Sequence, residues 1–136
     1  MIEITLPYPP SINHYKNPGR IVRTQSGQIF QKRVNSPETK QYYYTTWMLI
    51  TNYKTREGVK SFDSGTLWVD IDVFPPDHRK RDLDGILKVL LDSMQRGGLY
   101  ADDFQIARLT VQRKAIIPNG QVIVRISEIA DEPKPN

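Results

Sequence analysis

The sequence predicts an α+β domain in which helices pack on one face of a mixed sheet, and three features of the chain support this. Residues 2–6 and 66–74 alternate apolar and polar side chains, as half-buried strands do. Residues 36–58 and 82–98 contain the start and stop signals of helices. Two further segments are typical of strand pairs joined by turns. The resulting order is strand, hairpin, helix, strand, helix, hairpin, which is an α+β pattern.

The first and central strands are predicted from their two-residue period. Residues 2–6 bury alternate side chains, and Pro7 ends the strand. In residues 66–74 the apolar side chains occupy one face, so that Asp70 and Asp72 share the other.

Both hairpins are predicted from turn residues between short strands. Residues 20–33 surround the Ser26-Gly27 turn, and we expect this hairpin to form an exposed arm. Residues 104–130 supply two strands around a Pro-Asn-Gly turn at 118–120. The first of these strands projects Arg108 and Lys114 on one face. Strand order does not follow from these patterns.

The first helix is predicted to begin at Ser36, an N-cap followed by Pro37, and to stop at Gly58. Tyr43, Trp47 and Ile50 fall at helical spacing along it. Exposed aromatic side chains can stack on nucleic-acid bases, but we expect these three residues to pack against the sheet instead.

The second helix, residues 83–96, is amphipathic, with apolar side chains on one arc. Asp84, Lys88 and Asp92 follow one another at a spacing of four, so Lys88 can reach a carboxylate on either side. Gly97-Gly98 ends the helix with residues that can take positive φ.

Composition restricts the class of protein. The 136 residues suit one domain, residues 1–130, followed by a polar, proline-rich tail at 131–136. Without cysteine there are no disulfides or thiolate metal sites, and no long apolar segment predicts export or membrane insertion. We therefore expect a cytoplasmic protein. The net charge of +4 permits a polyanionic partner without requiring one.

The aspartates beside the second helix allow two explanations. In the structural one, Asp82 caps the helix, Asp84 interacts with the helix dipole, and Asp102 and Asp103 form a turn. In the functional one, Asp82 and Asp84 converge because they stand where a loop becomes a helix. The basic run "HRKR" precedes them directly. Carboxylates suit Mg²⁺ and cations suit phosphate, which together are the chemistry expected of a phosphodiesterase.

These segments resemble the RusA family of Holliday-junction resolvases, small endonucleases of bacteria and their phages. The resemblance rests on "PPSIN" at 9–13, "RDLDGILKVLLD" at 81–92 and "GLYADD" at 98–103, which occur in the family's order. The chain departs at Gly85, where the family often has asparagine, and the segment between the first hairpin and the central strand is longer than usual.

The resemblance implies a Mg²⁺-dependent endodeoxyribonuclease that acts as a homodimer on four-way DNA in recombination and repair, with Mn²⁺ as a possible substitute. It assigns the metal-binding carboxylates to Asp82, Asp84 and Asp103, and adds Lys88 as the fourth catalytic residue. Asp102 lies beside a matched position and could support the metal. Neither the number of metal ions nor the exact role of Lys88 follows from the sequence.

Seven basic residues are the candidate phosphate contacts, although a solvated surface explains each one equally well: Arg79, Lys80, Arg81, Arg20, Arg23, Lys32 and Arg33. Two other functions remain open. One is a non-catalytic protein that binds branched DNA, which the retention of every acidic position disfavours. The other is a metal-dependent nuclease that acts on a different DNA structure.

Overall fold

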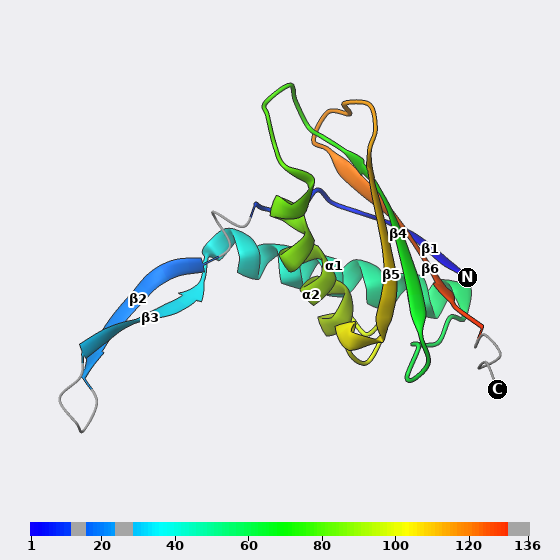
Figure 1. The fold of residues 1–136 in the computed structure, drawn as a ribbon, viewed down its shortest axis with the longest axis horizontal. Coiled ribbons are helices and arrows are strands. Elements are labelled where there is room, and N and C mark those ends of the chain that lie inside the picture. Colours follow the sequence, from blue (N-terminus) through cyan, green and yellow to red (C-terminus); the bar gives the residue numbers. More distant parts are fainter. Residues whose placement is uncertain (12–15, 24–28, 131–136) are drawn as a thin grey trace, which may run out of the picture.

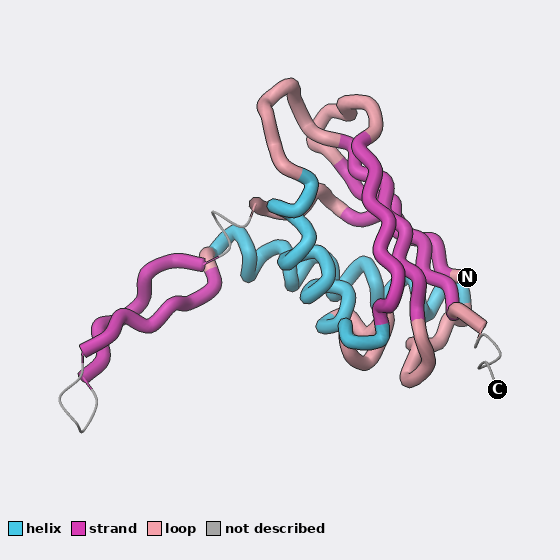
Figure 2. The backbone as a smooth tube through the Cα atoms, in the orientation of Figure 1, coloured by secondary structure: helices cyan, strands magenta, loops and turns pink. Residues whose placement is uncertain are grey.

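The computed structural model describes residues 1–11, 16–23 and 29–130, with only the backbone described between 16 and 34. It contains two sheets and two long helices (Figures 1 and 2). The elements are β1 (Ile2–Leu6), β2 (Lys16–Arg23), β3 (Ile29–Asn35), α1 (Pro37–Glu57), β4 (Leu67–Phe74), the 3₁₀ turn η2 (Leu83–Ile86), α2 (Leu87–Arg96), the 3₁₀ turn η3 (Asp103–Gln105), β5 (Ile106–Arg113) and β6 (Gln121–Glu128).

The main sheet has four strands in the order β1-β6-β4-β5. β6 pairs antiparallel with β1 and β4, whereas β4 and β5 are parallel. The predicted mixed sheet is confirmed, but the predicted closing hairpin is wrong because β4 lies between β5 and β6. Since α2 carries the chain back along the sheet, β5 starts at the same end as β4 and pairs in parallel with it. The turn before β6 nevertheless has positive φ at Asn119 and Gly120.

Both helices pack on one face of this sheet, as predicted. The core joins inward side chains of all four strands to Ile50 of α1, Ile86 of η2, and Leu90 and Met94 of α2. The opposite face is polar. There Arg125 Nη1 lies 2.9 Å from Asp72 Oδ2 and 3.6 Å from Asp70 Oδ2, which confirms that the two aspartates share a face.

Arg108 and Lys114 also lie on this polar face, as expected. The guanidinium of Arg108 is 4.7 Å from the centre of the Trp68 ring, and Lys114 Nζ is 4.0 Å from Asp72 Oδ1. Ile106 packs against the core, and a bulge follows it. From Arg108 onward, even-numbered side chains of β5 point away from the helices and odd-numbered ones point toward them.

The ends of α1 are those the sequence predicts. Ser36 Oγ accepts a hydrogen bond of 3.1 Å from the Thr39 amide, and Gly58 ends the helix at φ 64°. Ile50 is buried in the core with the sheet, as expected, whereas Tyr43 is buried against Val89 of α2 and Trp47 is 48% exposed. The expectation that all three residues pack on the sheet is therefore confirmed only for Ile50. The aromatic and apolar residues of α1 are distributed over all of its faces. Helical spacing alone could therefore not identify which of them are buried.

The predicted first hairpin is confirmed for the described backbone, because β2 and β3 pair antiparallel. Figure 1 shows it extending away from the main sheet at the start of α1. The Ser26-Gly27 turn, the tail at 131–136 and the side chains of the four basic residues on this arm lie outside the described residues. None of the described helices combines the length and the apolar character needed to cross a membrane.

The two glycines after α2 have different roles. Gly98 takes a φ of 85°, as predicted, whereas Gly97 keeps a negative φ of −75°. A Cβ on Gly97 would lie 2.5 Å from Cδ1 of the fully buried Ile50. Gly97 is therefore required for the close approach of α1 and α2, and not for the turn.

We expect Gly97→Ala to lower the free energy of unfolding by about 1–3 kcal/mol, because the added methyl group overpacks the contact with Ile50. Urea denaturation measures the change. Gly85→Ala is the control, since a Cβ there meets nothing within 4 Å. Adding Ile50→Val to Gly97→Ala removes the clashing methyl group, so the double variant should lose less stability than the sum of the two single changes. Strict additivity would contradict this explanation.

Candidate active site

Asp82 and Asp84 lie where the loop after β4 enters η2. The predicted helix over 83–96 is present as this 3₁₀ turn followed by α2. Asp82 occupies the N-cap position, but its side chain makes no capping hydrogen bond. Both side chains are exposed, and neither has a hydrogen-bond or ion-pair partner within the described part of the chain. Helix capping therefore does not account for Asp82.

Asp103 lies beside the other end of α2. Its backbone amide donates a hydrogen bond of 3.1 Å to Gln95 Oε1, while its carboxylate is exposed. Asp102 has a structural role, because its carboxylate accepts a hydrogen bond from the Phe104 amide in a capping box that starts η3. Burial raises the pKa of the neighbouring Tyr100 hydroxyl, and the negative charge of Asp103 raises it further.

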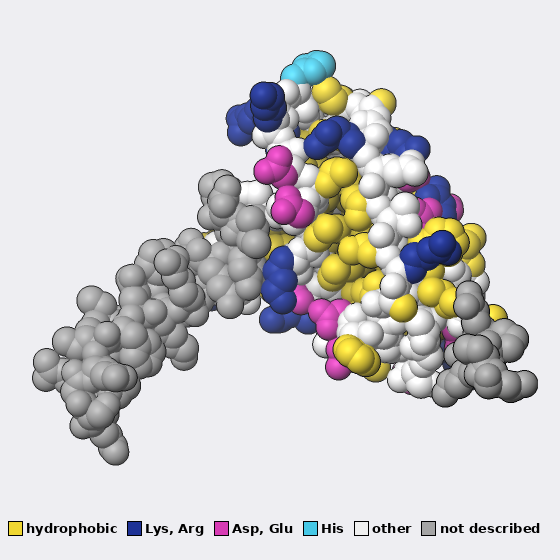
Figure 3. All heavy atoms as spheres, in the orientation of Figure 1, with side chains coloured by type: hydrophobic (Ala, Val, Ile, Leu, Met, Phe, Trp, Pro, Cys, Tyr) yellow, Lys and Arg dark blue, Asp and Glu magenta, His cyan; other side chains and the backbone are white. Residues whose placement is uncertain are grey.

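A single chain does not bring the three candidate metal ligands together. The ten residues of α2 span about 15 Å, which separates Asp82 and Asp84 from Asp103. Figure 3 shows acidic side chains at both ends of this helix. Among the described residues, no three or more histidine, cysteine, aspartate or glutamate side chains form a group that could hold a metal ion.

Lys88 lies between these two ends. Its Nζ is 3.3 Å from Asp92 Oδ2, so of the two carboxylates within helical reach it pairs with Asp92 and not with Asp84. Its side chain is half exposed. Lys88 is the second residue of α2, and its ammonium group points along the helix toward Asp92.

Hydrophobic side chains are also exposed between α2 and β5 (Figure 3). Leu83, Leu87 and Leu91 follow one another at helical spacing and are only partly buried, as is Val111 of β5. Leu109 of β5 is 41% exposed. These five residues form what we call the α2–β5 face. It lies along β5, the last strand in the order of the main sheet.

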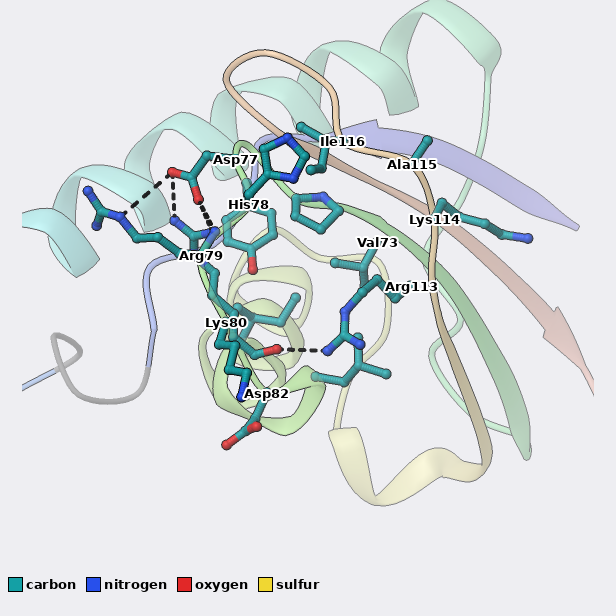
Figure 4. A pocket seen from close by; sticks show the side chains of 15 residues that line it. Val73, Asp77, His78, Arg79, Lys80, Asp82, Arg113, Lys114, Ala115 and Ile116 are labelled. Carbon is teal, nitrogen blue, oxygen red and sulfur yellow. Dashed lines mark hydrogen bonds and ion pairs between the residues drawn. The ribbon is translucent and has the colours of Figure 1, made fainter.

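A cleft of about 700 Å³ opens beside Asp82, between the loop after β4 and the end of β5 (Figure 4). Two hydrogen bonds hold this loop: Arg81 Nη1 to Asp77 Oδ1 at 2.5 Å and Arg81 Nη2 to Asp77 Oδ2 at 3.0 Å. The bond from Arg81, together with one from the Arg79 amide, holds the pKa of the Asp77 carboxyl well below its usual range. Arg79 and Lys80 are exposed, whereas Arg81 is ion-paired with Asp77.

A second cavity, of about 610 Å³, also borders Asp82. Pro9, Pro10 and Ser11 line it together with Asp84, so two sequence motifs meet at one place. Three other lining residues are Glu38, Gly85 and Ile86. Since a Cβ on Gly85 would meet nothing within 4 Å, the asparagine common in the family would have space here.

Sequence reasoning missed three residues of these cavities. Glu38 stands in the first turn of α1 and lines the second cavity, which no local sequence signal indicates. Asp77 stands four residues before Arg81, a spacing that could have indicated their pairing. Arg113 enters the first cleft from the end of β5, and no signal for it existed without the strand order.

Known proteins are similar to this chain over nearly its whole length. The family described as "Endodeoxyribonuclease RusA" matches residues 7–127. The crossover junction endodeoxyribonuclease rusA of Enterobacteria phage HK97 is 31% identical over 93% of this chain and 94% of its own length. The enzymes named crossover junction endodeoxyribonuclease RusA from Shigella sonnei and Escherichia coli K12 are each 28% identical over 95% of this chain and 96% of their own length. Together with the segments around Asp82 and Asp103, these matches show that the chain belongs to the RusA endodeoxyribonuclease family.

Proposed function

We propose that this protein is a Mg²⁺-dependent endodeoxyribonuclease that resolves Holliday junctions by paired phosphodiester hydrolysis. The observation that carries the proposal is the pair of unpartnered carboxylates, Asp82 and Asp84, beside a cleft with exposed cations. The bacterial and phage relatives are named crossover junction endodeoxyribonucleases, which supports the same substrate. The proposed place of action is the bacterial cytoplasm, and the proposed process is DNA recombination and repair.

The proposal includes a homodimer, because a four-way junction has approximate twofold symmetry and paired cuts require two active sites. A twofold axis across α2 would place a second α2 antiparallel to the first, at a typical interhelical distance of about 8–10 Å. The α2–β5 face supplies apolar surface for such a contact. In this arrangement Asp103 of the partner subunit would approach Asp82 and Asp84.

The two-chain arrangement would also bring together the ligands of the metal ion. The three carboxylates do not form a metal group within one chain, but their oxygen atoms are the donors that Mg²⁺ prefers. We propose that Asp82 and Asp84 of one chain and Asp103 of the other hold the ion, with Mn²⁺ as a possible substitute. When bound, Mg²⁺ supplies Lewis-acid chemistry that activates water and screens the charge of the attacked phosphate.

The remaining candidate residues would position the DNA. Lys88 would place a positive charge beside the scissile phosphate or hold an aspartate in place. Arg79 and Lys80 would contact neighbouring phosphates, while Arg81 would mainly order the loop through Asp77. The β2–β3 arm would extend this contact through the remaining candidates, Arg20, Arg23, Lys32 and Arg33.

A cleavage assay on a synthetic four-way junction tests the function. We expect two symmetric cuts in Mg²⁺ and none in EDTA, and a linear duplex of the same sequence should remain intact. Binding without cleavage in Mg²⁺ or Mn²⁺ would instead identify a non-catalytic junction-binding protein. Equal cleavage of duplex or flap substrates would identify a nuclease of different specificity.

A further inference from the structure

Arg113 is the cation that reaches the middle of the cleft beside Asp82 (Figure 4). It is the last residue of β5 and points to the helix side of the sheet, whereas its neighbour Lys114 turns toward Asp72 on the polar side. Because β4 and β5 are parallel, β5 ends at the same end of the sheet as β4, where the loop that leads to Asp82 begins. The fold therefore brings Arg113 close to Asp82, which lies 31 positions earlier in the chain.

Arg113 is attached to the segment just before Asp82. Its Nη2 donates a hydrogen bond of 2.7 Å to the backbone carbonyl oxygen of Arg81. A guanidinium group has five N–H donors, so this bond leaves most of them available. The residue itself is exposed to solvent.

No carboxylate within the described residues neutralises Arg113. Two carboxylates line the cleft: Asp77 is already paired with Arg81 and approached by Arg79, and Asp82 forms no ion pair with Arg113. An unpaired guanidinium in a concave site suits an anion that can accept several hydrogen bonds, and phosphate oxygens do so in a forked geometry.

We propose that Arg113 binds a phosphate of the DNA backbone in this cleft, next to the strand that is cut. The hydrogen bond to the Arg81 carbonyl oxygen would then fix this phosphate contact relative to Asp82. Arg113 would be a positioning residue for the scissile strand, in addition to the seven basic residues expected from the sequence. The inference rests on the proposed function only for the identity of the polyanion.

The test measures the affinity for a labelled four-way junction in EDTA over a range of salt concentrations. We expect Arg113→Gln to weaken binding about tenfold, as expected for one charged hydrogen-bonded contact. The slope of log affinity against log salt should also fall by about 0.9, the value for one phosphate contact. Arg113→Lys keeps the charge and should keep the wild-type slope.

Arg108→Gln is the matched control, because Arg108 lies on the same strand and loses the same charge on the opposite face. Its slope should stay at the wild-type value. If Arg113→Gln reduces cleavage or stability but leaves the slope unchanged, Arg113 only holds the loop and the inference is wrong. Equal slopes for Arg113→Gln and Arg108→Gln would overturn it as well. Since binding is measured without metal, a wild-type protein that binds junctions but does not cut them contradicts the proposed function and leaves this test valid.

Discussion

Asp82→Asn is expected to lower the rate of junction cleavage about 1,000-fold, which is the upper range for losing one group that stabilises charge in a transition state. The amide keeps the shape of the side chain but removes the charge that a divalent cation requires. Junction binding should persist or strengthen, because one negative charge near the phosphates is gone. Single-turnover cleavage and binding in EDTA measure the two effects separately.

The control for this change is Asp63→Asn, which removes the same charge from an exposed loop between α1 and β4. Cleavage by the control should match the wild type. The stability of Asp82→Asn should also be close to that of the wild type, because the carboxylate makes no capping hydrogen bond. Full cleavage activity in Asp82→Asn would show that this residue is not a metal ligand.

Leu109→Glu is expected to raise the dissociation constant of the dimer at least about 100-fold, because a dimer contact would bury an unpaired charge. Leu109 is 41% exposed in the single chain, so a glutamate there can remain hydrated when the chain is monomeric. Cleavage should fall together with the dimer fraction. Sedimentation at several protein concentrations measures the first effect, and the junction assay measures the second.

Leu49→Glu is the matched control, because Leu49 is 39% exposed and lies on α1, away from the α2–β5 face. It introduces the same charge at nearly the same exposure. The control should remain dimeric and active. If Leu109→Glu stays dimeric, or if both variants dissociate equally, the α2–β5 face is not the interface.

Local signals in the sequence predicted most of the elements. Ser36 and Gly58 mark the ends of α1, and the alternation in residues 67–74 identifies β4 and its two faces. Strand pairing was not predictable in the same way. A turn at Asn119-Gly120 is a local property, whereas the position of β4 between β5 and β6 depends on the path of α2 across the sheet. The burial of Tyr43 but not Trp47 depends on the packing of α1 as a whole.

The same distinction holds for the candidate site. Spacing drew attention to the aspartates at the two ends of the second helix, and the family resemblance proposed Asp82, Asp84, Asp103 and Lys88 as the site residues. The sequence left open whether the chain after the helix would bring Asp103 back to Asp82 and Asp84. It does not, because η3 and the bond from the Asp103 amide to Gln95 hold Asp103 at the far end of α2. Arg113 joins the cleft only through parallel pairing, which no local pattern indicates.

The most direct test of the central claim, that two chains share each set of carboxylates, combines the inactive variants Asp82→Asn and Asp103→Asn. In a heterodimer of the two, one shared site would contain both substitutions and the other would contain neither. Co-expressed chains carrying different tags should therefore regain nicking of a single strand, with about one quarter of the wild-type number of sites if the chains pair at random. If purified heterodimers remain as inactive as each variant alone, every site draws its carboxylates from one chain and the shared arrangement is wrong.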